Sequence, residues 1–263
     1  MSVKIMMLIV MSLMFFSGCS EDSSRYAEEK PRLLVYTGVT MVNPMVELAA
    51  IVESKCACRI TILQDASSNH FNAIKALQQG DLFLPGDESF IEQAAEKGFI
   101  SQTVLVGFNR AAIMVNRGNP LGLKGDPAEL LNPEYAVVLA DPELGSIGRE
   151  TTAVFARKGL AEEILDNIMY YAADSKGVTM AIVRGQAHAG INWYAPSVWD
   201  ENKEHVQALL MDEKYAPPRA LILAKLSFSK HAEEALVFME IASGPIGKAI
   251  FRKHGFILEE DSL

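Results

Sequence analysis

The sequence lacks the short motifs that identify common enzymes. It contains no Gly-X-Ser-X-Gly elbow, no Walker loop, no His-Glu-X-X-His pair and no cysteine or histidine spacing typical of zinc sites. None of the histidines pairs with a serine or cysteine at a motif spacing; they are His70, His188, His205, His231 and His254. His70 follows Ser67 and Ser68, but a position in the first turn of a helix, in contact with solvent or ligand, explains it better than a catalytic dyad. The sequence therefore predicts a protein without catalytic residues, metal or cofactor.

Positive charge is scarce. Twenty-four Lys and Arg residues stand against 33 Asp and Glu residues, which gives a net charge of −9. Nucleic-acid binding needs a basic surface, so this balance argues against that class of partner. It does not exclude an anionic ligand, because the local field of a cleft governs binding more than the total charge.

Only three cysteines are present, and two of them, Cys56 and Cys58, are a single residue apart. No other cysteine or histidine cluster accompanies them, which argues against a redox or metal site. We expect a turn between a helix and a strand, and the sequence leaves open whether a disulfide bridges it.

No apolar run is long enough to cross a membrane. The longest, residues 5–16, follows Lys4 and falls short of the roughly 20 residues that a spanning helix needs. A positive charge, an apolar stretch and the small residues before Cys19 are typical of an export signal of the bacterial lipoprotein type, with Cys19 as the lipidated residue. Phe16 departs from the usual aliphatic residue, so cleavage to a free periplasmic protein remains an alternative. Residues 20–31 are polar and are expected to form a flexible tether.

The remaining chain alternates short apolar strands with helical segments, which is typical of an α/β protein. The predicted strands are 33–36, 59–63, 80–84, an extended segment 104–115, 135–139, 189–193 and 219–224. The predicted helices are 42–53, capped by Asn43, then 71–79, about 87–98, 150–158, 161–172, 177–184, 233–242 and 246–253, the last stopped by Gly255.

Four polar loops adjoin predicted strands or open predicted helices: 37–40, 67–69, 145–149 and 174–178. A helix start offers free N–H groups and the positive end of the helix dipole, so each loop could bind an anion, although ordinary N-capping explains any one alone. In an open α/β sheet, ligands bind at the carboxyl ends of the strands. The four loops are therefore expected to face a common crevice.

The order of these segments, from Thr37-Gly-Val-Thr40 to Ile250-Phe-Arg-Lys-His-Gly-Phe256, resembles the molybdate/tungstate-binding proteins of ABC importers. The resemblance covers residues 32–256 and implies the type II periplasmic-binding-protein fold. Two α/β lobes, 32–108 plus 219–263 and 109–218, would be joined by crossovers near 108–110 and 212–218. The ligand would lie in the cleft between them.

That family holds a tetrahedral oxyanion with neutral donors, and the resemblance places those donors on particular residues. The serine positions correspond to Thr37 or Thr40 and to Ser67 or Ser68. The backbone donors correspond to Ser146, Ile147 or Gly148 and to Gly177 or Val178. The family tyrosine falls on Trp193, with Tyr194 after it, and an indole can donate a hydrogen bond but cannot accept one.

A second departure from the family pattern is Arg149, which directly follows the 145–148 loop. It could pair with a carboxylate or phosphate in the cleft, or lie solvated on the first turn of a helix. With Trp193 and Tyr194 in the cleft as well, the pocket would suit a larger organic anion better. Asp65 or Asp87 could supply the acceptor that a protonated oxyanion requires.

These observations predict an extracytoplasmic solute-binding protein, monomeric and with one site, that closes two lobes on a small anion and docks on a membrane permease. A larger organic anion, a peptide or a thiol is the alternative cargo. A sensory role is the alternative to transport.

Overall fold

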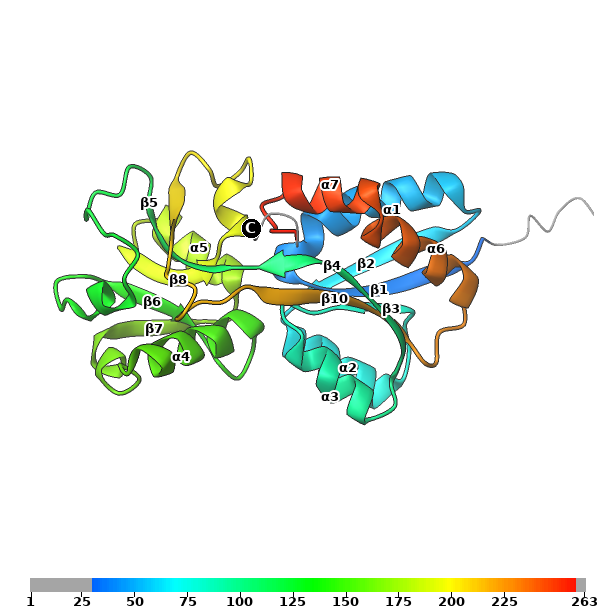
Figure 1. Cartoon of the computed structure of the whole chain (residues 1–263), viewed down its shortest axis with the longest axis horizontal. Coiled ribbons are helices and arrows are strands. Elements are labelled where there is room, and N and C mark those ends of the chain that lie inside the picture. Colours follow the sequence, from blue (N-terminus) through cyan, green and yellow to red (C-terminus); the bar gives the residue numbers. More distant parts are fainter. Residues whose placement is uncertain (1–29, 259–263) are drawn as a thin grey trace, which may run out of the picture. The chain divides into compact units, whose positions relative to one another are not determined.

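The computed structural model describes residues 30–258; Cys19, the predicted export signal and most of the predicted tether lie outside the described residues. Two mixed five-stranded sheets organise this part of the chain (Figure 1). The first sheet has the order β2-β1-β3-β10-β4 and the second β7-β6-β8-β5-β9. We call residues 31–109 plus 219–258 the first lobe and residues 111–210 the second lobe.

The first lobe surrounds the first sheet with helices on both faces. Its strands are β1 (Arg32–Gly38), β2 (Arg59–Asp65), β3 (Leu82–Leu84), β4 (Ile100–Asn109) and β10 (Arg219–Leu226). Its helices are η1 (Val39–Met41), α1 (Val42–Lys55), α2 (Ser67–Leu77), α3 (Ser89–Glu96), α6 (Ala232–Ser243) and α7 (Pro245–Lys253). Side chains of β1 alternate between the two faces of the sheet and belong to two apolar cores. Leu33 and Val35 pack with α1 and α6 on one face. Tyr36 packs with Phe71 of α2 and Phe90 of α3 on the other.

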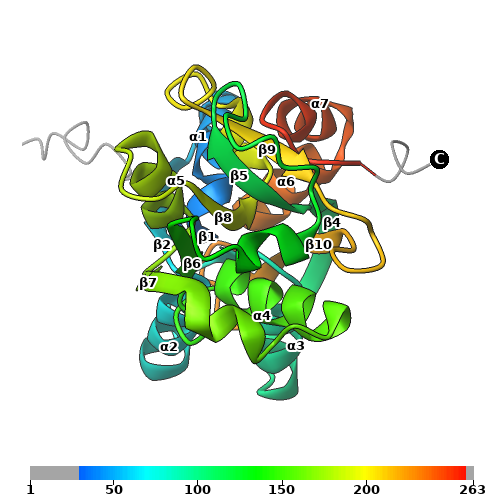
Figure 2. The same ribbon diagram turned by 90° about the vertical axis from the view of Figure 1, so that its left-hand side faces the viewer.

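The second lobe contains the other sheet and two longer helices. Its strands are β5 (Ala111–Asn116), β6 (Val137–Ala140), β7 (Ile168–Ala172), β8 (Ala189–Trp193) and β9 (Val206–Leu210). Its helices are α4 (Ser146–Lys158), α5 (Ser175–Val183) and the short η2 (Pro127–Leu131), η3 (Glu163–Asn167) and η4 (Ala195–Val198). Helices α4 and α5 both pack on β6 and β8 (Figure 2), around one continuous apolar core.

The chain passes between the lobes twice. Arg110 alone separates β4 from β5, and residues 211–218 lead from β9 to β10. Strands β1, β2 and β3 run parallel to one another, as do β6, β7 and β8. In each lobe the carboxyl ends of three parallel strands therefore meet at one edge of the sheet.

One predicted helix is wrong. Residues 161–172 do not form a helix: η3 covers only Glu163–Asn167, and Ile168–Ala172 is the edge strand β7, paired in parallel with β6. The segment Ile-Met-Tyr-Tyr-Ala consists largely of residues that fit a pleated surface, and pairing with β6 satisfies its backbone. The extended segment 104–115 is divided between β4 and β5 in different sheets, and strand β9 was not predicted.

Several helix boundaries also differ from expectation. Helix α1 starts at Val42, directly after η1, so Asn43 is not its cap. Helices α2 and α4 begin at Ser67 and Ser146, four residues earlier than predicted, which places two of the polar loops inside first helical turns. Gly255 has the predicted left-handed conformation, with φ of 88°.

Cys56 and Cys58 form a disulfide in the turn between α1 and β2. Among residues 30–258, no helix combines the length and apolar character needed to cross a bilayer.

Candidate functional site

A small cavity lies where the carboxyl strand ends of the two lobes meet. Its volume is about 20 Å³, which favours a guest of few atoms. The residues that line it come from both lobes: Gly38, Val39, Thr40, Met41, Ala66, Ser67, Gly86, Gly145, Ser146, Ile147, Asp174, Ser175 and Trp193. In the described part of the chain, no lysine or arginine lines this cavity.

Helices α2, α4 and α5 all start at the cavity. The caps of α2 and α4, Ala66 and Gly145, provide no side-chain hydrogen bond to the first turn. The first backbone N–H groups of a helix have no partner within that helix, and the helix dipole adds partial positive charge there. The starts of α2 and α4 therefore give the cavity anion-binding character without a cationic side chain.

Hydroxyl groups add donors to this arrangement. Ser67 is buried, and its Oγ accepts a hydrogen bond from the backbone N of Gly86 at 3.0 Å, which leaves its own proton free to donate. Ser146 is buried at the start of α4, and Thr40 is buried with its Oγ1 3.0 Å from the sulfur of Met41. A hydroxyl that already accepts one hydrogen bond is well suited to donate the next to an anion.

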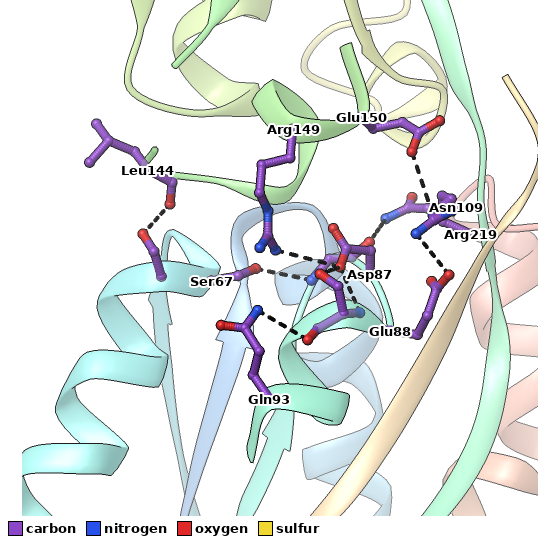
Figure 3. A network of polar contacts seen from close by, with 12 residues as sticks. Ser67, Asp87, Glu88, Gln93, Asn109, Leu144, Arg149, Glu150 and Arg219 are labelled. Atoms are coloured by element: carbon purple, nitrogen blue, oxygen red, sulfur yellow. Dashed lines mark hydrogen bonds and ion pairs between the residues drawn. The ribbon is translucent and has the colours of Figure 1, made fainter. Parts of the chain in front are cut away.

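Gly86 brings the two lobes close together at the cavity. A Cβ atom at this position would lie 3.0 Å from Ser146 Cβ and in steric overlap with Ser146 Oγ. Asn109, at the end of β4, holds the loop in place by donating from Nδ2 to the carbonyl of Gly86 at 3.1 Å (Figure 3). Only a residue without a side chain permits this approach of the Gly86 loop to α4.

The part of the cavity wall at the start of α5 differs from the parts at α2 and α4, because a side chain caps this helix. Asp174 caps the helix: its Oδ1 accepts from the backbone N of Gly177 at 2.8 Å, while the N–H of Val178 bonds to the carbonyl of Asp174. Gly177 and Val178 thus have their donors occupied, and neither lines the cavity. The neighbours that do line it are Asp174 and Ser175.

Five of the predicted site residues line the cavity, and the others do not. Those in the lining are Thr40, Ser67, Ser146, Ile147 and Trp193. Thr37 is fully buried next to the cavity residues, with its hydroxyl unpartnered and its carbonyl in contact with Nε2 of His70 at 3.0 Å. Ser68 donates instead to the carbonyl of Leu144 in the second lobe, and Gly148 packs on the backbone of Asp141.

Arg149 also lies outside the lining. Its Nη2 is 3.6 Å from Oδ1 of Asp87 (Figure 3). Its guanidinium stacks 3.7 Å from the centre of the ring of Phe90. Both partners belong to the first lobe, so Arg149 makes an ion pair and a cation–π contact from one lobe to the other. Arg149 therefore contacts a carboxylate and an aromatic ring of the protein. The sequence had suggested either contact with an anionic ligand in the cleft or a solvated position on the first helical turn.

A second set of ion pairs lies beside the first. Arg219, the first residue of β10, is 2.9 Å from Oε1 of Glu88 and 3.5 Å from Oε2 of Glu150, which belong to different lobes (Figure 3). Burial raises the pKa of the Glu150 carboxyl, against the lowering effect of Arg157 at 2.8 Å. The charged contacts between lobes are therefore gathered beside the cavity, not inside it.

Neither acid proposed from the sequence as an acceptor lines the cavity. Asp87 is occupied by Ser89 and Arg149, and Asp65 bonds to the backbone of Ala66. The acid in the lining is Asp174, which belongs to a predicted loop but was not singled out.

Tyr194 lines a different and larger cavity of about 390 Å³ beside the two crossovers and the segment that follows α7. That cavity holds none of the helix starts described above. Its wall includes the cationic residues Arg110, Arg252 and Lys253, but it does not lie where the carboxyl ends of the parallel strands of the two lobes meet, so we take the small cavity as the candidate site.

Known proteins share this architecture. The sequence profile of the bacterial extracellular solute-binding proteins matches residues 33–257. The Bacillus subtilis (strain 168) protein YvgL, whose name places it among the ABC transporter substrate-binding lipoproteins, is 24% identical over 262 residues, covering 94% of this chain and 95% of YvgL.

Three solved structures extend the comparison. The Azotobacter vinelandii periplasmic molybdate-binding protein has a TM-score of 0.73 at 18% identity over 86% of this chain and 99% of its own. The sulfate-binding protein SubI from Mycobacterium tuberculosis H37Rv has a TM-score of 0.75 at 14% identity over 86% of each chain. A periplasmic thiamin-binding protein has a TM-score of 0.74 at 13% identity over 87% of this chain and 83% of its own. These likenesses confirm the predicted type II periplasmic-binding-protein fold.

Proposed function

The chain belongs to the bacterial extracellular solute-binding proteins, the substrate-binding components of ABC transporters, and we propose that it captures a compact tetrahedral oxyanion. Molybdate and tungstate belong to this class of ligand. A permease in the membrane is the partner that such a component implies. Family members of this kind bind and deliver a solute and are not enzymes.

The observation that carries the proposal is the small cavity between the lobes. The uncapped starts of α2 and α4 and the hydroxyls of Ser67 and Ser146 converge on it without any cationic side chain. Neutral, preorganised donors from both lobes favour an anion and stabilise the closed arrangement when the anion binds. The name of the Azotobacter relative, a molybdate-binding protein, supports the same class of ligand.

A larger organic anion, a peptide or a thiol is the second candidate cargo, and the thiamin-binding relative has a comparable fold. Two residues that would have favoured it, Arg149 and Tyr194, lie outside the lining. The volume of about 20 Å³ also favours a ligand of few atoms. A sensory role would use the same site, and the presence of permease and ATPase genes beside the gene of this protein would favour transport.

Anchoring through Cys19 is part of the proposal, although that residue lies outside the described part of the chain. The lipoprotein name of YvgL supports it. We further propose a monomer with one site, located on the outer side of a membrane.

Calorimetric titration of the purified protein with molybdate, tungstate, sulfate, phosphate, small carboxylates and glutathione tests the ligand class. We expect at least one tetrahedral oxyanion to bind and the organic compounds not to bind. Ser67→Ala and Ser146→Ala should each weaken binding by about 1.5–3 kcal/mol, because a hydrogen bond to a charged group is lost.

The matched control is Ser101→Ala, which removes an exposed hydroxyl bonded to the carbonyl of Lys225, away from the cavity. It should bind as the parent protein does. Binding of an organic anion alone, or unchanged affinity in both cavity variants, would refute the proposed ligand class.

A further inference from the structure

The start of α5 provides hydrogen-bond acceptors to a cavity that otherwise offers donors. Asp174 lines the cavity, and only one of its carboxylate oxygens, Oδ1, is used for the helix cap. Within residues 30–258, Oδ2 has no hydrogen-bond partner. A carboxylate oxygen can only accept a hydrogen bond, so it offers nothing to a fully deprotonated anion.

The hydroxyl of Ser175 can also only accept a hydrogen bond from a ligand, because its proton is already donated within the protein. Its Oγ donates to Oδ1 of Asn192 at 2.6 Å, and Ser175 is buried. The orientation of the Asn192 amide is fixed by its surroundings: Nδ2 donates to the carbonyl of Ser175 at 2.8 Å, and Oδ1 accepts from the backbone N of Trp193 at 2.8 Å. A flipped amide would set two acceptors against each other and two donors against each other. The Ser175 proton therefore points to Asn192, and only its lone pairs remain for a ligand.

The two acceptors have opposite consequences for two kinds of oxyanion. Sulfate, molybdate and tungstate carry no proton near neutral pH, so one of their oxygens would meet a carboxylate and a lone pair. Phosphate and arsenate keep a proton on one oxygen and can donate it to Asp174. A site with a partner fixed in place, as Asp174 is by its cap of α5, discriminates against the analogue that lacks the matching group.

We infer that Asp174 makes this protein selective for an oxyanion that carries a proton, such as hydrogen phosphate or hydrogen arsenate, over oxyanions that carry none. The inference rests on the proposed capture of a tetrahedral oxyanion and narrows that class. Asp174 and Ser175 form the specificity-determining wall, while the starts of α2 and α4 bind the remaining oxygens.

Titration of the purified protein with phosphate, arsenate, sulfate, molybdate and tungstate at neutral pH tests the inference. We expect phosphate and arsenate to bind about 100-fold or more tighter than the other three. A preference for sulfate, molybdate or tungstate would overturn it. Binding of none of the five would overturn the proposed oxyanion ligand itself, so the two failures can be told apart.

The variant Asp174→Asn removes the charge but keeps a side-chain oxygen that can cap α5. Its amide can donate to an unprotonated oxyanion, so the preference for phosphate over sulfate should fall about tenfold or more. Asp126→Asn is the control, because Oδ1 of Asp126 also caps a helix, η2, outside the cavity, while its Oδ2 pairs with Lys158. An unchanged phosphate-to-sulfate ratio in Asp174→Asn, or an equal change in Asp126→Asn, would overturn the role of Asp174.

Ser175→Ala provides a second variant should Asp174→Asn fail to fold. It removes one acceptor and leaves Oδ1 of Asn192 bonded to the backbone of Trp193. Dihydrogen phosphate carries a second proton that this lone pair can accept and sulfate carries none, so at about pH 6 the variant should weaken phosphate several-fold more than sulfate. Equal weakening of both ligands would count against the acceptor wall.

Discussion

Adding one methyl group at Gly86 should hinder closure of the lobes on the ligand without disturbing either lobe. The backbone of Gly86 is outside the left-handed region, so alanine fits its conformation. The added Cβ would overlap Ser146 Oγ and lie 3.0 Å from Ser146 Cβ. Ser146 belongs to the other lobe, so this clash exists only when the two lobes meet.

The size of the effect follows from what has to move. The Ser146 hydroxyl can rotate away from the new methyl group, but it then loses its place as a donor to the anion. A hydrogen bond to a charged group contributes about 1.5–3 kcal/mol, so Gly86→Ala should weaken binding about 10- to 150-fold. Separation of the lobes to relieve the Cβ contact would add to that loss. The melting temperature of the ligand-free protein should stay nearly unchanged, because no contact within the first lobe is lost.

A double-mutant cycle isolates this mechanism. Ser146→Gly removes both atoms that clash, and it costs the same donor, so Gly86→Ala combined with Ser146→Gly should bind no more weakly than Ser146→Gly alone. Affinities of the four proteins can be measured by calorimetry with the tightest oxyanion. Additive losses of about 3–6 kcal/mol would refute the reasoning, since they would mean that Gly86 acts independently of Ser146.

Two further predictions concern groups near the cavity. Arg149→Ala should weaken ligand binding by about 1 kcal/mol in calorimetry, because the contacts of Arg149 with Asp87 and Phe90 join the lobes. The melting temperature of the ligand-free protein should change little. A marked drop in melting temperature with unchanged affinity would contradict this. Burial lowers the pKa of His70 from its ordinary value of 6.5, so the unfolded chain binds the proton more readily and stability should fall as pH drops below about 6.5. His70→Gln should flatten the decline in melting temperature between about pH 7.5 and pH 5, and an unchanged pH profile would exclude His70 as its source.

The sequence predicted the architecture because hydrophobic patterning and strand–helix alternation survive in the fold. Strands such as β1 alternate between two cores, and the helix starts lie at strand ends as expected. The failure at β7 has a physical cause. Residues 168–172 have an apolar run at the sheet edge, with Tyr170 and Tyr171 exposed, and the pairing with β6 that decides their conformation is invisible to local periodicity.

The candidate site was predicted at the level of loops but not of atoms. Ser67 and Ser68 are adjacent and chemically identical, yet the first lines the cavity and the second bonds to Leu144 in the other lobe. The difference follows from the rotation of about 100° per residue around α2, which the predicted start at residue 71 could not supply. The sequence analysis did not identify Gly86, because its role depends on contact with Ser146. These residues are 60 positions apart in the chain, so local sequence patterns do not show that they meet.

The ion pairs between the lobes lie beside the cavity, whereas Asp174 is a charged residue in its lining, so the two should affect ligand selection differently. The ion pairs between lobes, Arg149 with Asp87 and Arg219 with Glu88 and Glu150, lie outside the lining, so we expect them to form whether the bound anion is phosphate or molybdate. They can favour closure, but they contribute equally for every ligand of similar size. Selectivity must then arise from the direction of the hydrogen bonds inside the cavity, where a donor faces an oxygen or an acceptor faces a proton. A change of charge beside the cavity should therefore shift all affinities together, whereas a change at Asp174 should reorder them.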